Sequence, residues 1–405
     1  MTPVTRQVVF INAAHTITHY ALLILATASL AMVYQEPDLF GADYGPVITM
    51  GTAMFVVYGA LALPMGWLQA RLGRKALMVA FYFGAGAGMV LAGLAQSAWM
   101  LGLWLGVMGA FLAIYHPIGT AIIAECGGDR VGRAMGINGV FGNLGVALAP
   151  LVTGLLAAQF GWRLAFILPG LCCAAIGVLY AREPAFDGTR LPGAKPFPQI
   201  PAPVVRRAVM VLLALGATSG LVFNAFTLLV PKLMEERLAT SPDLLPLIAL
   251  LAFAATICGG ITQFTVGSMI DRRTLKGVFM PLALMLVPGL LALSFLQGWV
   301  VLPVSAMVAA AIFGQVTVNE TMMARYIAPP LRAKLYSVRF TVGFMGAALA
   351  SPLIGTLHQA TGSLAVTMLV LGGISMITLA CALAFPNREE ELKPELWARQ
   401  VAPAE

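Results

Sequence analysis

The sequence has little charge. Asp, Glu, Lys and Arg together make up 10% of its 405 residues, whereas a soluble domain carries about 25%. Apolar residues account for 60%, and the mean hydropathy is +0.88. This composition excludes an ordinary soluble protein, and apolar stretches along the whole chain exclude a soluble domain with one anchor. A polytopic membrane protein remains, with room for about ten to thirteen spans of roughly 20 residues each.

Cysteine pairs and catalytic motifs are also missing. The five cysteines form no C-x-x-C pair and lie mostly in apolar runs, so we interpret them as packing residues and predict neither a disulfide set nor a zinc site. The sequence contains no G-x-x-x-x-G-K-[ST], H-E-x-x-H or G-x-S-x-G, which argues against an ATP-driven pump. We therefore predict a protein that is not an enzyme, needs no cofactor and takes its energy from an ion or solute gradient.

Polar breaks divide the chain into two halves. The longest break, 183–206, contains six prolines and lies between the sixth and seventh apolar spans, as expected of a linker. We predict an all-α membrane protein with an N-terminal six-helix bundle (1–182), a cytoplasmic linker (183–206), a C-terminal six-helix bundle (207–387) and a charged cytoplasmic tail (388–405). The predicted spans are 8–33, 47–70, 76–95, 99–124, 134–159, 163–182, 207–234, 244–270, 278–298, 300–328, 336–360 and 364–385.

The distribution of Lys and Arg predicts the orientation. If the N-terminus is cytoplasmic, only Arg163, Lys232 and Arg237 of the 24 basic residues fall outside. Cytoplasmic loops of membrane proteins carry an excess of Lys and Arg. We therefore expect both termini in the cytoplasm of a multi-pass protein of the bacterial inner membrane.

An internal repeat supports the division into halves. Gly66, after the second span, and Gly267, after the eighth, begin similar short motifs 201 residues apart. Ala149-Pro150-Leu151 in the fifth span matches Ser351-Pro352-Leu353 in the eleventh at an offset of 202. One offset on both sides of a linker indicates two duplicated six-helix halves, as in many transporters.

The first of these motifs carries a family resemblance. Gly66-x-Leu68-x-x-Arg71-x-Gly73-Arg74-Lys75 resembles the signature between spans two and three of the major facilitator superfamily. The resemblance implies two six-helix bundles, a secondary transporter with alternating access, and Ala70 where the family has an acid. The residues that it assigns to gating loops are Gly66, Arg71, Gly73, Arg74, Gly267, Asp271 and Arg272.

Spans four and five point to a branch of that superfamily. The fifth span, with Gly136, Gly145 and Ala149-Pro150, resembles the antiporter signature of drug exporters, although Ala149 and Thr153 replace glycines. Tyr115-His116-Pro117, followed by Gly132-Arg133-Ala134-Met135-Gly136, is similar to the fosmidomycin-resistance-like branch. Both resemblances imply efflux, whereas generic helix packing explains the same small residues.

Three histidines lie inside predicted spans. His15 and His19 share a face of the first span because they are four residues apart. His116 lies in the fourth span, and both His15 and His116 are placed about 7 Å to the cytoplasmic side of the midplane. The histidines are candidates for proton coupling, for a transition-metal site, or for hydrogen bonds between helices.

Glu320 in the tenth span is expected to be a buried acid, which makes it a candidate for proton coupling. Arg339 in the eleventh span is expected to snorkel to the interface, to pair with Glu320 or to contact an anionic substrate. Asn12, Asn138 and Asn224 are candidate substrate contacts, although such residues more often bridge helices.

Together these features predict a secondary active transporter. The favoured interpretation is a proton-coupled exporter of a small organic molecule that uses His15, His19, His116 and Glu320. One alternative is an importer of a transition metal or metal chelate, and another is a non-transporting sensor or assembly factor. The expected partners are a small-molecule substrate, the proton gradient and the lipid bilayer, without nucleic acid, and the protein is expected to act as a monomer.

Overall fold

The computed structural model describes residues 2–127, 131–185, 197–238, 244–393 and 396–397. Much of the predicted linker and the end of the predicted tail therefore lie outside the described residues. The helices are α1 (Pro3–Gln35), α2 (Pro37–Phe40), α3 (Tyr44–Thr49), α4 (Gly51–Ala62), α5 (Met65–Leu72), α6 (Arg74–Gly93), α7 (Ala98–Leu112), α8 (Tyr115–Gly127), α9 (Val131–Phe160), α10 (Trp162–Ala181), α11 (Ala202–Leu238), α12 (Leu245–Ile270), α13 (Leu275–Leu293), α14 (Val301–Tyr326), α15 (Pro329–Thr361) and α16 (Ala365–Ala384).

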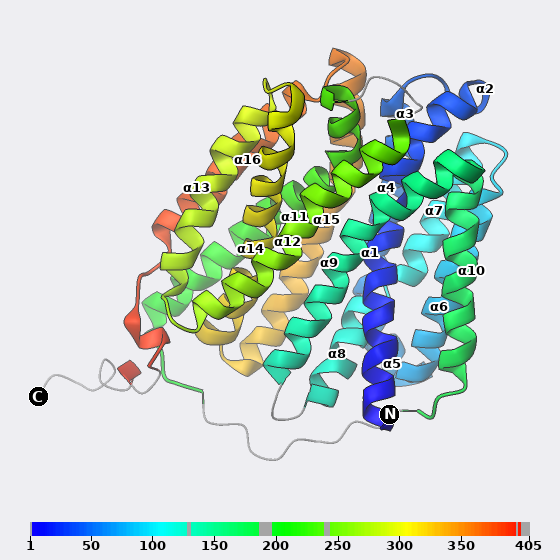
Figure 1. Ribbon diagram of the computed structural model, residues 1–405. Coiled ribbons are helices and arrows are strands. Elements are labelled where there is room, and N and C mark those ends of the chain that lie inside the picture. Colours follow the sequence, from blue (N-terminus) through cyan, green and yellow to red (C-terminus); the bar gives the residue numbers. More distant parts are fainter. Residues whose placement is uncertain (1, 128–130, 186–196, 239–243, 394–395, 398–405) are drawn as a thin grey trace, which may run out of the picture.

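The prediction of twelve spans is confirmed. Twelve helical segments among the described residues are long and apolar enough to cross a membrane, and Figure 1 shows them as one bundle of long helices. Two predicted spans are broken: 47–70 contains α3, α4 and α5, and 99–124 contains α7 and α8. The seventh span begins at Ala202, five residues before the predicted start.

The helices alternate in direction, so two ends of the bundle can be distinguished. Figure 1 shows the N-terminus, the end of α10 and the start of α11 at one end, which we call the terminal end. The opposite end, which carries α2 and the start of α12, we call the distal end. The sequence predicts that the terminal end is cytoplasmic.

The fourth span is interrupted next to His116. Helix α7 ends at Leu112, a turn occupies 113–114, and α8 begins at Tyr115. Pro117 has no N–H to donate to the carbonyl of Ala113, so the helical hydrogen-bond ladder cannot continue through this point. The break makes α8 a separate short helix that carries His116 at its start.

Glycines allow the two halves to pack closely at the distal end. A Cβ on Gly45 of α3 would lie 2.6 Å from the carbonyl oxygen of Gly355 in α15. A Cβ on Gly154 of α9 would lie 2.4 Å from the Cβ of Ala249 in α12. Because both distances are below normal contact, glycine at these positions permits the backbones of the two halves to touch.

The segment after α16 packs onto the C-terminal half. Glu391 is 5% exposed and Trp397 is 2% exposed. The Glu391 carboxylate accepts hydrogen bonds from the backbone N–H of Leu275 and from the Tyr326 hydroxyl, and the Trp397 ring lies 6.1 Å from that of Tyr326. Part of the predicted charged tail is therefore a docked element.

Candidate functional site

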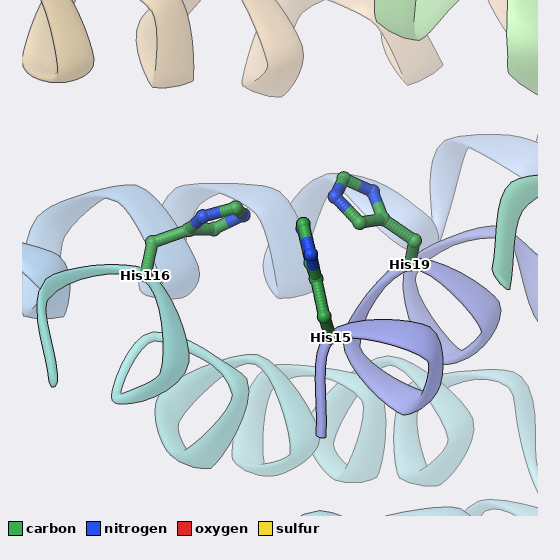
Figure 2. A group of neighbouring side chains, drawn as sticks. All are labelled: His15, His19 and His116. Carbon is green, nitrogen blue, oxygen red and sulfur yellow. The ribbon is translucent and has the colours of Figure 1, made fainter. Parts of the chain in front are cut away.

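His15, His19 and His116 converge in the N-terminal half. One ligand nitrogen from each imidazole can be chosen so that all three lie within 4.8 Å of one another. The ring centroids of His15 and His19 are 5.0 Å apart, and those of His15 and His116 are 5.4 Å apart. Figure 2 shows the two α1 side chains and the α8 side chain pointing toward a common space. The structure thus brings together the three histidines that the sequence placed on one face and at one depth.

The position of the His15 ring is fixed by its neighbours. Its Nδ1 lies 2.7 Å from the backbone carbonyl oxygen of Asn138. A carbonyl only accepts, so Nδ1 carries the proton and Nε2 keeps its lone pair. The ring stacks on Tyr115 at 4.7 Å, and Gly142 of α9 leaves it room, because a Cβ there would lie 2.6 Å from His15 Nε2.

Asn138 ties three helices together beside the histidines. Its side-chain amide donates to the Oδ1 of Asn12 in α1 at 2.8 Å and to the Tyr115 hydroxyl in α8, also at 2.8 Å. Asn12 and Asn138 are both buried. Asn224 is not part of this network, since its amide donates to the backbone carbonyl of Gly220 one turn earlier in α11.

Glu320 forms an ion pair in the C-terminal half. Arg339 Nη1 of α15 donates to Glu320 Oε1 of α14 at 2.8 Å. Of the three interpretations of Arg339, the structure contains the pairing with Glu320. The expectation of a buried acid is wrong, because the Glu320 side chain is 44% exposed whereas that of Arg339 is 16% exposed. The helical position of Glu320 turns its carboxylate to the edge of α14, where the arginine reaches it.

A small cavity in the C-terminal half contains three unpaired polar atoms. Ser219 of α11 and Gln315 and Asn319 of α14 line it together with apolar side chains such as Phe223 and Ile312. Among the described residues, Ser219 Oγ, Gln315 Nε2 and Asn319 Oδ1 are buried without a hydrogen-bond partner. Buried polar groups are normally paired, and the cavity volume of about 20 Å³ leaves room for about one water molecule to pair with these atoms.

The repeat predicted from the sequence would relate this cavity to the histidines, because it pairs the spans of α11 and α14 with those of α1 and α7–α8. The repeat offset of 202 residues brings His116 onto position 318, next to Asn319.

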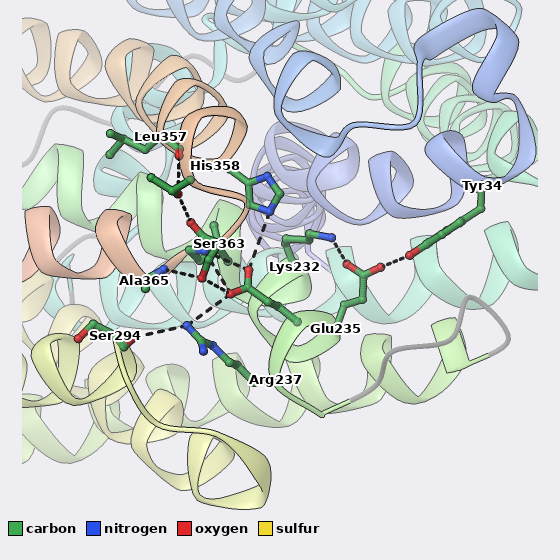
Figure 3. A network of polar contacts seen from close by, with 12 residues as sticks. Tyr34, Lys232, Glu235, Arg237, Ser294, Leu357, His358, Ser363 and Ala365 are labelled. Atoms are coloured by element: carbon green, nitrogen blue, oxygen red, sulfur yellow. Dashed lines mark hydrogen bonds and ion pairs between the residues drawn. The ribbon is translucent and has the colours of Figure 1, made fainter.

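A polar network that was not predicted from the sequence joins the halves at the distal end. The Tyr34 hydroxyl of α1 donates to Glu235 of α11 at 2.7 Å, and Lys232 contacts the other carboxylate oxygen (Figure 3). The side chain of Glu235 is only 6% exposed. Lys232 also lies 5.5 Å from the ring centroid of Tyr44 in α3, so cations and acids of α11 face aromatic residues of the N-terminal half.

Glu236 extends the same network within the C-terminal half. Its carboxylate accepts hydrogen bonds from the Ser363 hydroxyl and from the backbone N–H of Leu364. Arg237 lies 3.4 Å and His358 3.9 Å from it, and Figure 3 shows these side chains around one carboxylate. His358 is thus the one histidine of the four that lies outside the N-terminal cluster.

The residues assigned to gating loops lie at the terminal end. Gly66, Gly73, Asp271 and Arg272 are exposed and Gly267 is half-buried. Arg71 stacks on the Trp67 ring at 4.0 Å.

Arg74 forms the charged contact of the first gating loop. It bonds Glu125 of α8 at 2.5 Å. In the second half, Arg325 of α14 donates to the carbonyl of Ile270 at the end of α12. Glu125 thus supplies an acid for the first loop, where Ala70 lacks one.

Contacts between the halves lie at the distal end and in the middle of the bundle. In the middle, Asn143 of α9 donates to Gln263 of α12, and Tyr58 of α4 packs edge-on against Phe344 of α15 at 4.7 Å. At the terminal end, the ion pair of Arg74 and the hydrogen bond of Arg325 each stay within one half. The described contacts therefore hold the halves together away from the terminal end.

Comparison with known proteins places this architecture among transporters. A model of the Major Facilitator Superfamily matches residues 14–319. Proteins named multidrug resistance protein MdtG from Serratia proteamaculans and Citrobacter koseri are each 34% identical over 135 residues, which cover 31% of this chain. The match spans about a third of the length of these relatives, 32% in both cases.

A solved structure shares the fold over the whole chain. A bacterial homologue of the human lysosomal transporter Spinster, described as inward-facing and occupied, superposes with a TM-score of 0.69 over 100% of both chains. The sequence identity is 15%, so this likeness concerns the fold.

Proposed function

Because this chain belongs to the Major Facilitator Superfamily and is a multi-pass inner-membrane transporter, we propose that it is a proton-coupled exporter of a small amphipathic organic molecule. The observation that carries the proposal is the Glu320–Arg339 ion pair, whose acid follows the cavity residue Asn319 in the sequence of α14. A carboxylate that takes up a proton on the helix that carries Gln315 and Asn319 would link proton binding to substrate binding.

The contacts between the halves support an inward-facing state. With the terminal end in the cytoplasm, as the Lys and Arg distribution predicts, the distal network of Tyr34, Glu235 and Lys232 closes the outer side. The separate contacts of Arg74 and Arg325 leave the cytoplasmic ends unjoined. Alternating access would then break the first set and join the loops at the terminal end.

The residues around the small C-terminal cavity would suit an amphipathic substrate once a movement of the helices widens it. Ser219, Gln315 and Asn319 offer a hydroxyl, an amide donor and an amide acceptor, while Val222, Phe223, Leu286 and Ile312 offer apolar surface. Binding sites of this kind fix orientation with a few polar groups and gain affinity from the apolar ones. The export direction is supported by the span-five pattern and by the printed names of the MdtG relatives.

Coupling follows from the charge balance of the pair. Arg339 is the charged group that faces Glu320 from α15. Protonation of Glu320 removes the negative charge, frees the guanidinium and weakens the contact between α14 and α15. A proton entering from outside and a substrate leaving the cytoplasm can therefore alternate at neighbouring sites.

The test uses purified protein in liposomes that contain a pH-sensitive dye. A panel of amphipathic amines, carboxylates and phosphonates is screened for solutes that cause proton movement. For a solute found in this way, Glu320→Gln should abolish proton movement but retain substrate exchange at equal pH, because the neutral side chain can still hydrogen-bond to Arg339.

The matched control is Glu183→Gln. Glu183 also pairs with an arginine, Arg6, at 3.1 Å, but it lies after α10 and away from the cavity. This variant should couple normally. Unchanged proton movement in Glu320→Gln would remove the coupling role, and the absence of any transported organic solute would remove the proposed substrate class.

A further inference from the structure

We propose that His15, His19 and His116 form a binding site for a divalent transition-metal ion such as Zn²⁺, Co²⁺ or Ni²⁺. This binding goes beyond the proposed export function and does not depend on it. The cluster contains imidazoles without carboxylates or thiolates, a ligand set that favours these ions over Mg²⁺ or Ca²⁺.

The spacing of the ligand atoms is close to that of an occupied site. Zinc–nitrogen bonds of about 2.0–2.1 Å in tetrahedral geometry place nitrogens about 3.3 Å apart. Here the three ligand atoms lie within 4.8 Å of one another. Rotations of the side chains can close this difference, since His19 and His116 are not fully buried.

The surroundings of His15 are those of a metal ligand. Its Nδ1–H donates to the carbonyl of Asn138 at 2.7 Å, which leaves Nε2 to bind the ion. Metal-binding histidines usually donate their second N–H to a carbonyl or carboxylate in this way, and such partners change metal affinity by about 10- to 100-fold. The stacked Tyr115 ring holds the His15 ring in this orientation. Gly142 permits it, because a Cβ at that position would clash with the His15 ring.

Three protein ligands leave one position open in a tetrahedral site. Sites with an open position exchange their fourth ligand, whereas structural zinc sites use four protein ligands. Because the site is largely enclosed and its ligands are neutral, the charge of the ion favours an anionic fourth ligand. The site therefore suits a reversibly bound ion.

The experiment measures Co²⁺ binding to the full chain in detergent, with any affinity tag removed and the free cysteines alkylated. A site of three histidines should bind one Co²⁺ per chain and give the strong visible absorption of tetrahedral cobalt, and Zn²⁺ should remove that absorption. Each of His15→Gln, His19→Gln and His116→Gln should lower the affinity at least tenfold. Neither substrate nor a proton gradient is present, so failure of the export proposal leaves this result unaffected.

Two further variants separate metal binding from folding. His358→Gln changes the remaining histidine, which lies at the distal end, and should bind cobalt like the parent protein. Gly142→Ala keeps all three ligands but places a Cβ 2.5 Å from the His15 ring, so it should also lower the affinity at least tenfold. Thermal unfolding without metal checks that each variant is folded. Cobalt that stays octahedral, or equal binding by the triple glutamine variant, would overturn the proposal.

Discussion

Removal of the hydrogen bond between Tyr34 and Glu235 should change the equilibrium between the two transport states. This bond joins α1 to α11 at 2.7 Å, and its acceptor is a carboxylate whose side chain is 6% exposed. Tyr34→Phe removes only the hydroxyl group. The bond exists while the distal end is closed and must break when that end opens. Its loss therefore destabilises only the state in which the distal end is closed.

The size of the effect follows from the exposure of the partners. Hydrogen bonds to charged groups contribute about 1.5–3 kcal/mol, but Tyr34 is 47% exposed and water can replace part of the bond. Lys232 still holds Glu235 in the variant. We therefore expect a loss of about 1–1.5 kcal/mol, which corresponds to a shift of roughly five- to tenfold in the equilibrium between states.

The measurement is the distance distribution between spin labels at the terminal end, one on Leu72 of α5 and one on Ser268 of α12, in a cysteine-free background. Both positions are exposed. In Tyr34→Phe the population with a short distance should rise by the stated factor, because the terminal end closes as the distal end opens.

The control is Tyr20→Phe. Tyr20 lies on the same helix, but its hydroxyl bonds Thr153 of α9 at 3.0 Å within one half, so the distribution should not change. Equal distributions in Tyr34→Phe and the parent would refute the assignment of this bond to one state.

Two further predictions concern the terminal end. Burial raises the pKa of Glu391 above its ordinary value near 4.5, so the folded state holds this proton more tightly and docking of the tail weakens as the pH rises through the raised pKa. Glu391→Gln should remove that pH dependence from the protection of amides 389–393 against hydrogen exchange, taken relative to the intrinsic exchange rate at each pH; an identical profile of protection in both proteins would contradict it. Glu125→Gln should release Arg74 and lower the rate of substrate exchange several-fold with little change in thermal stability, because a partly exposed pair contributes little to folding; an unchanged exchange rate would show that the pair does not act in gating.

Much of the fold could be predicted because lipid imposes a simple rule on sequence. A span must be apolar and about 20 residues long, and the twelve apolar runs met that rule even where helices break, as at Ala113. The histidine cluster was predictable for a related reason: spacing along one helix fixes a face, and depth in the membrane aligns His116 with it.

Contacts that depend on the approach of the two halves could not be read from the sequence. Glu235 stands in a stretch of charged residues at the end of a span, which is also what a solvent-exposed loop would contain, and only the packing of α1 against α11 buries it. For Glu320 the prediction was wrong in the opposite sense: the side chain was expected to be buried but is 44% exposed. Hydropathy places a residue inside a span but does not say which side of the helix it occupies. The docking of Trp397 likewise depends on the surface that Tyr326 offers.

The break at 113–114 separates α8 from α7, so that α8 can move as a unit. This short helix carries His116 at one end and Glu125 near the other, and Glu125 is tied to Arg74 at the start of α6. One end of this helix therefore lies beside the histidines and the other near the terminal end. A movement of α8 would change the separation of His116 from the two α1 histidines, so closing of the terminal end would alter the binding of whatever these three rings hold.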